Sequence, residues 1–124
     1  MVGWLLFFIS FFLPTVRGIA SGWEAFYFAF IAGKLFHFTS ALSNIPMLLT
    51  PLALQLKSKK LNVAMSIIMI AATLLNSLWY IKFPEERRDL QAGYFLWVTS
   101  FAIVAIAITL RARDLHKSSA PISN

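Results

Sequence analysis

Four long apolar stretches dominate the chain, and the segments between them carry all of its charged side chains. The stretches are residues 2–16, 35–56, 61–81 and 93–110. A helix needs ~20 residues to cross ~30 Å of hydrocarbon, so the last three each have about the length of one membrane span. The first is shorter and would cross with the help of tilt or local thinning of the bilayer. The pattern predicts an all-α fold, a bundle of four transmembrane helices.

The first stretch has a second interpretation, as a secretory signal peptide. Gly18-Ile19-Ala20 offers small residues near a candidate cleavage site. However, no Lys or Arg precedes the apolar run, whereas a signal peptide begins with a basic segment. We therefore favour a first helix that is retained.

A short aromatic segment follows the first stretch. Ser21 and Glu24 have the spacing of a capping box, in which each side chain bonds the backbone N–H of the other residue. The helix they begin, residues 22–32, would be about 16 Å long at ~1.5 Å per residue, which is too short to span. We expect it to lie at the outer membrane interface. The alternative is one long helix from Trp23 onward, which would place Lys34 deep in the hydrocarbon.

Polar residues in the third stretch fall on one side of the expected helix. They are Asn62, Ser66, Thr73, Asn76 and Ser77. At ~100° per residue this stripe covers about 100° of the circumference. Because polar atoms avoid lipid, we expect the stripe to face other helices and to bond them. The stripe would either hold helices together or form the polar lining of a substrate path.

The second stretch combines polar residues with two prolines, Pro46 and Pro51. Its polar residues are His37, Thr39, Ser40, Ser43, Asn44, Thr50 and Gln55. A proline lacks a backbone donor, so a carbonyl one turn earlier needs another partner in lipid. We expect a bend near Pro46. The bend is either purely structural or a polar site around His37, Ser40 and Asn44, of the kind that transporters build at broken helices.

Small residues recur every seven positions in the fourth stretch, at Gly93, Ser100 and Ala107. Such residues allow helices to approach closely. Because a short link joins the third and fourth stretches, we expect these two helices to pack as an antiparallel hairpin.

The composition supports the bilayer as the solvent of this chain. Of 124 residues, 59% are hydrophobic and only 13% are charged, against about 45–50% and about 25% in soluble domains. The mean hydropathy is +0.73. These values exclude a soluble enzyme and a free nucleic-acid-binding domain, although the net charge is +6.

Basic residues at the ends of the apolar stretches predict the orientation. Lys57, Lys59 and Lys60 follow the second stretch, and Arg111 and Arg113 follow the fourth. Basic loops favour the cytoplasmic side and attract anionic headgroups. Both termini are then cytoplasmic, and the 82–89 link faces out. The tail, residues 118–124, is expected to be disordered.

Few side chains are suited to catalysis. His37 is the one histidine within a stretch, and a zinc site needs three or four ligands. The chain has no cysteine, and no catalytic or nucleotide-binding motif is present. We expect no enzyme activity, no metal and no cofactor.

Three motifs resemble a group of small, uncharacterised bacterial membrane proteins. They are Phe12-Leu13-Pro14, Gly22-Trp23-Glu24-Ala25 and the string from Gly93 to Ser100, GYFLWVTS. In that group a first helix ends in such a proline, and the last helix opens with the Gly-aromatic string. The resemblance implies four spans and a bacterial inner membrane, and it implies no activity.

These observations favour a non-enzymatic protein that docks to a membrane-protein partner or to copies of itself. It would be an accessory subunit or an immunity-type protein, comparable in size and charge to those that protect against pore-forming bacteriocins. The alternative is a small oligomeric transporter or channel that uses the polar face of the second stretch. A phage holin is a further alternative, which only the basic tail supports.

Overall fold

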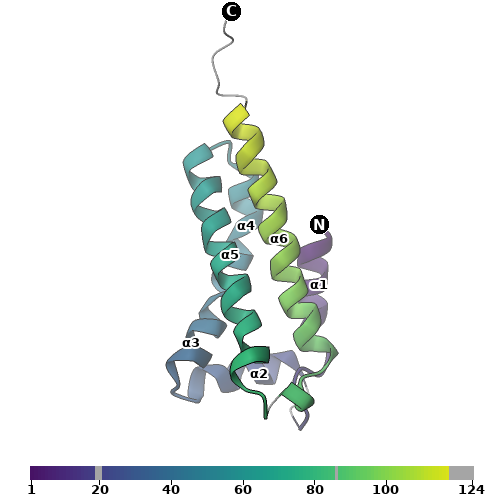
Figure 1. Cartoon of the computed structure of the whole chain (residues 1–124). Helices are drawn as coiled ribbons and strands as arrows, with labels where there is room; N and C mark the ends of the chain where they lie inside the picture. Colours follow the sequence, from purple (N-terminus) through teal and green to yellow (C-terminus); the bar gives the residue numbers. More distant parts are fainter. Residues whose placement is uncertain (19–20, 86, 118–124) are drawn as a thin grey trace, which may run out of the picture.

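The computed structural model describes residues 1–18, 21–85 and 87–117, and its regular elements are helices (Figure 1). They are α1 (Val2–Ser10), α2 (Gly22–Ile31), α3 (Leu35–Leu42), α4 (Asn44–Gln55), α5 (Lys59–Lys82), the 3₁₀ helix η1 (Arg87–Asp89) and α6 (Ala92–Lys117). The all-α fold class is confirmed. Ile19, Ala20 and the tail at 118–124 lie outside the described residues, and so does the expectation of disorder for that tail.

The α5–α6 hairpin forms the centre of the molecule (Figure 1). Both helices are long and apolar enough to cross a membrane, and among the described residues they are the two helices that are. Met69 of α5 and Phe101 and Ile108 of α6 are completely buried in the shared core. Each helix extends past its predicted apolar stretch into charged residues.

The small residues of α6 do not pack where we expected them to. An ideal Cβ on Gly93 would lie 2.8 Å from the carbonyl oxygens of Leu13 and Pro14, so Gly93 faces the segment after α1. The Ser100 carbonyl lies against α1, and Ala107 is exposed. The expected hairpin therefore forms, but the glycine and the serine bring α6 close to the first helix rather than to α5.

The predicted first span is wrong in length, because α1 ends at Ser10. The next two amides bond carbonyls three residues back, Phe11 to Phe8 and Phe12 to Ile9, which tightens the last turn. Pro14 has no amide hydrogen with which to continue the helix. The chain then runs extended, and the isolated backbone bridge between Val16 and Leu90 ties it to the segment before α6.

The predicted second span is not one helix but two, α3 and α4, which meet at Ser43. Pro46 explains the break, because it cannot donate to the carbonyl of Leu42 and its ring crowds that turn. The Ser43 hydroxyl donates to the Ser40 carbonyl at 2.6 Å, and the Asn44 amide donates to the Ala41 carbonyl at 2.7 Å. The bend predicted near Pro46 is thus confirmed, and it is sharp enough to end a helix.

A second proline is accommodated inside α4. Pro51 leaves the Met47 carbonyl without its backbone donor. The Thr50 hydroxyl donates to this oxygen at 2.7 Å, and the Trp4 indole approaches it at 3.4 Å and donates to Thr50 Oγ1 at 3.0 Å. The helix therefore continues through Pro51, and the same bonds attach α1 to α4.

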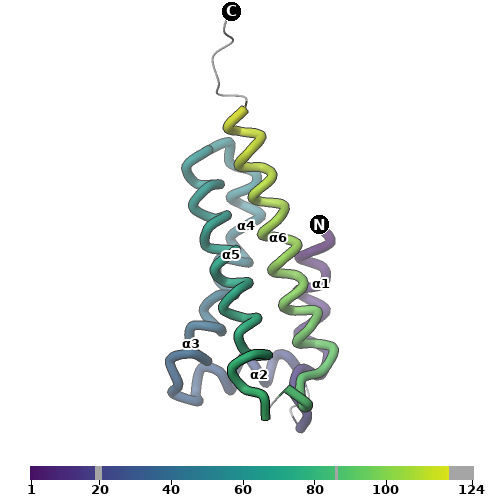
Figure 2. Tube along the Cα trace, viewed as in Figure 1, coloured from purple at the N-terminus to yellow at the C-terminus, as the bar shows by residue number. Residues whose placement is uncertain are grey.

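Helix α2 is separate from α3 and lies across one end of the bundle (Figure 2). Its capping box is present: Ser21 Oγ accepts from the Glu24 amide at 3.5 Å, and a Glu24 carboxylate oxygen accepts from the Ser21 amide at 3.2 Å. Gly33 has a φ of +65°, which glycine adopts readily and which turns the chain between the helices. The alternative of one continuous helix from Trp23 is therefore wrong.

Candidate functional site

A buried hydrogen-bond network surrounds the α3–α4 break, and the Asn76 side chain of α5 is at its centre. Asn76 is completely buried. Its Oδ1 accepts from the Ser40 hydroxyl at 2.8 Å, and its Nδ2 donates to the Ser43 hydroxyl at 3.0 Å. Both ends of one amide thus hold the last residues of α3 against α5.

Three aromatic side chains complete the network from α5 and α6. Trp79 Nε1 donates to Ser40 Oγ at 3.1 Å, and Trp97 Nε1 donates to Asn44 Oδ1 at 2.9 Å. The Tyr94 hydroxyl donates to the backbone carbonyl of Asn76 at 2.9 Å. The network therefore connects α3, α4, α5 and α6, and it pairs the side chains of Ser40, Ser43, Asn44 and Asn76.

A cavity of about 90 Å³ adjoins this network. Its surface is almost entirely apolar, and α2 closes one side with Ala25, Phe26 and Ala29. The lining also includes Gly22 of α2, the end of α1 and the segment after it, and Ser40, Ala41 and Asn44 at the break. Trp79, Leu90, Tyr94 and Trp97 complete it. We call it the α2 cavity. It lies at the end of the bundle where α5 ends and α6 begins.

The structure brings together three of the predicted site residues, Ser40, Asn44 and Asn76, and sets His37 beside them. The His37 ring lies edge-on to the Trp79 ring with 4.5 Å between centroids. Phe36 and Phe83 pack around the same indole. His37 is half-buried in this aromatic cluster and is not among the residues that line the α2 cavity.

The other residues of the α5 stripe have separate local roles. Ser66 bonds Thr109 of α6 at 2.6 Å. Asn62 is completely buried, and its Nδ2 donates to the Leu56 and Ser58 carbonyls at 3.0 and 2.9 Å, which fixes the turn into α5. Thr73 is half-buried, and its hydroxyl donates to the carbonyl of Met69 in its own helix at 2.8 Å. The stripe is therefore no continuous polar lining.

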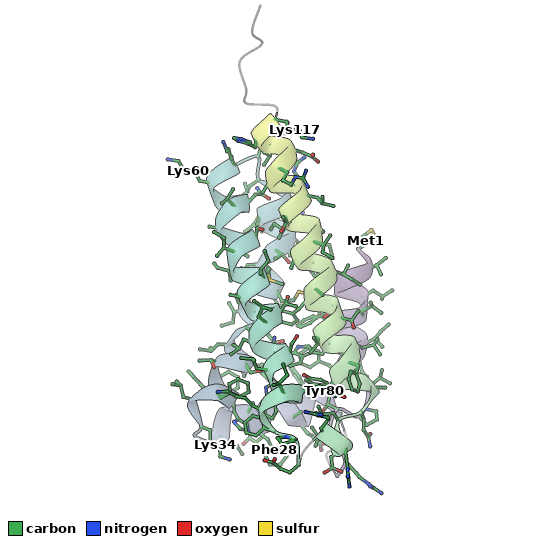
Figure 3. All side chains as sticks on the ribbon, in the orientation of Figure 1. Met1, Phe28, Lys34, Lys60, Tyr80 and Lys117 are labelled. Atoms are coloured by element: carbon green, nitrogen blue, oxygen red, sulfur yellow. The ribbon has the colours of Figure 1, made fainter. Side chains whose placement is uncertain are left out.

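The basic residues chosen for orientation lie together at the opposite end from the α2 cavity (Figure 3). They are Lys57, Lys59, Lys60, Arg111 and Arg113, in or beside the start of α5 and the end of α6. Figure 3 shows Lys60 and Lys117 at this end, and Phe28, Lys34 and Tyr80 at the other. The end with the α2 cavity also carries the mixed-charge link, where Arg87 lies over the Tyr80 ring and donates from Nε to the Tyr80 carbonyl at 2.9 Å.

Sequence reasoning missed the two indole donors and the Tyr94 hydroxyl, because aromatics near the ends of apolar stretches are also typical of the membrane interface. Their position one or two turns inside the helix ends, beside buried serines and asparagines, was the available signal. Within residues 1–18, 21–85 and 87–117, no three His, Cys, Asp or Glu side chains gather as metal ligands would. Comparisons with protein-family models, curated proteins and solved structures gave no match.

Proposed function

We propose that this chain is an integral membrane protein of the bacterial inner membrane that works as an accessory or immunity-type subunit, through contact with a membrane-protein partner. Residence in the bilayer is supported by the outer surface of the hairpin. Ile67 and Leu74 in the middle of α5 are each 63% exposed, and Ile106 in α6 is 61% exposed. Large apolar side chains that are exposed along both helices are better suited to contact with lipid or a protein partner than to contact with water.

In this proposal four segments cross or enter the bilayer. The α5–α6 hairpin crosses it, the α3–α4 pair crosses as a broken helix, and α1 packs along α6. Broken helices are tolerated at membrane depth where their backbone groups are satisfied within the protein, and here the side chains of Ser43 and Asn44 bond the Ser40 and Ala41 carbonyls. The lysines and arginines at one end favour a cytoplasmic position for that end and for both termini.

One observation carries the choice of a contact function over a transport path: the polar side chains at the break bond one another. The Asn76 amide, the Ser40 hydroxyl and the Asn44 amide all have partners within the chain. A path needs polar groups that turn toward a passing substrate, whereas these groups hold helices in place. The arrangement supports a rigid bundle that presents its outer surface to a partner.

Photo-crosslinking in living cells tests this proposal. A crosslinking amino acid at Ile67, Leu74 or Ile106 should yield a discrete adduct with one partner or with a second copy of the chain. The completely buried Met69 is the matched control, and a crosslinker there should give no adduct. Lipid adducts alone at every exposed position, with no stoichiometric protein in a mild-detergent pulldown, would contradict the proposal.

The α2 cavity beside a broken helix supports a second candidate, a small oligomeric transporter or channel. In that case Ser40 and Asn44 exchange their internal partners for substrate. Flux through proteoliposomes would then be lost in Asn44→Leu while expression persists. Equal flux in Asn44→Leu and in the unmodified protein would exclude a path through this break.

A further inference from the structure

The α2 cavity contains a polar atom that the rest of the protein does not satisfy. Thr15 lines the cavity, is 8% exposed, and its Oγ1 has no hydrogen-bond partner. Buried hydroxyls are normally paired, so an orphan of this kind needs an explanation. Its backbone is held firmly, because the Gln91 amide donates to the Thr15 carbonyl at 2.8 Å. The hydroxyl therefore belongs to a residue whose backbone is anchored beside an apolar space.

The size and lining of the α2 cavity define what it can hold. An apolar cavity of ~150 Å³ accepts benzene. In proportion, about 90 Å³ accommodates roughly four non-hydrogen atoms. Ala25 and Ala29 keep the α2 side open, and the indoles of Trp79 and Trp97 provide flat apolar walls.

The position of the cavity further limits which ligands could bind there. Its lining residues Trp79 and Tyr94 lie within about one turn of the end of α5 and the start of α6. In a membrane this is the depth of the interface, where short amphiphilic groups such as alcohols and the glycerol-ester region of lipids concentrate. Such a group has the small apolar body and the single hydrogen-bonding oxygen that the α2 cavity matches.

We propose that the α2 cavity binds one small oxygen-bearing amphiphilic group, with its carbon portion between Trp79, Trp97 and Phe26 and its oxygen bonded to Thr15 Oγ1. Two sources share this chemistry, a free short-chain alcohol and the ester end of a membrane lipid. The inference rests on the proposed residence in the bilayer but not on the partner-binding function, because the exposed surface of α5 and α6 plays no part in it.

Quenching of tryptophan fluorescence by 2-bromoethanol, which has four non-hydrogen atoms, tests the proposal, since Trp79 and Trp97 line the site. The expected result is saturable quenching above the linear collisional background. Ala29→Leu fills the cavity and should remove the saturable component, and Ala25→Val is a second filling variant should that protein fold poorly. Ala71→Leu makes the same change on the exposed side of α5 and should leave the component intact.

Thr15→Val tests the polar contact, because valine has nearly the same shape and no hydroxyl. It should weaken the binding of 2-bromoethanol about 3- to 10-fold, as the loss of one neutral hydrogen bond does, and leave the binding of 1-bromopropane, in which a methyl replaces the hydroxyl, unchanged. Saturation in delipidated detergent but not in vesicles identifies a lipid ester as the natural occupant, and saturation in both identifies a free alcohol. Linear quenching in both media, or the same saturable component in Ala29→Leu, would overturn the proposal.

Discussion

Replacement of Asn76 by leucine is the sharpest test of the network at the helix break. Leucine has the branched shape of asparagine and a larger volume, so the change removes hydrogen bonds without opening a cavity. Two bonds are lost, from Ser40 Oγ and to Ser43 Oγ. At ~0.6–1.5 kcal/mol for each interhelical bond in a membrane, their loss lowers the free energy of unfolding by about 1–3 kcal/mol. Overpacking by the larger leucine adds about 1–3 kcal/mol. The bond from Tyr94 uses the backbone carbonyl and should survive.

Reversible unfolding in mixed micelles, followed by circular dichroism, measures this loss. Thr73→Val is the matched control on the same helix, because its hydroxyl bonds only its own backbone, and it should cost less than about 0.5 kcal/mol. A double-mutant cycle with Ser40→Ala should give a coupling of about 0.6–1.5 kcal/mol between Ser40 and Asn76. Equal losses in Asn76→Leu and Thr73→Val, or zero coupling, would refute the assignment of Asn76 as the hub.

Three further predictions concern the rest of the bundle. Trp4→Phe removes the indole donor to Thr50 and should lower the free energy of unfolding by about 0.5–1.5 kcal/mol in the same micelle assay; no change would mean that the bond does not hold α1. Gly93→Ala places a Cβ 2.8 Å from two backbone oxygens and should cost about 1–3 kcal/mol, whereas an unchanged stability would contradict the close approach of α6. The chain lacks cysteine, so single introduced cysteines report the membrane topology directly. In spheroplasts an impermeant maleimide should label Glu85→Cys and should not label Ser58→Cys. The reverse labelling pattern would contradict the proposed orientation.

The two long helices were predictable from the sequence because their signals are local. Residues 61–81 and 93–110 were expected as spans, and α5 and α6 contain both stretches. Charge-free runs of this length have few other stable forms in a membrane. The capping box of α2 was equally predictable, since its two side chains are three residues apart.

The broken helix and the network were only partly predictable, because they depend on contacts between distant residues. Pro46 indicated a bend, but only the side chains of Ser43 and Asn44 determine where the helix stops. Ser40 and Asn76 are 36 positions apart, and no periodicity within one helix shows such a pair. Likewise, the sequence showed Trp97 at the end of an apolar run, where an interfacial role and a buried bond to Asn44 give the same pattern.

The most direct test of the account is a nitroxide scan along the middle of α5 in lipid vesicles. Oxygen partitions into lipid, so its accessibility should be highest at Ile67, Ile70 and Leu74, which are exposed, and lowest at Met69 and Ala72, which are buried. A water-soluble nickel chelate should be excluded at all five positions. Nickel accessibility at Ile67 and Leu74, with no helical period in the oxygen profile, would show that this face meets water and would contradict the membrane bundle.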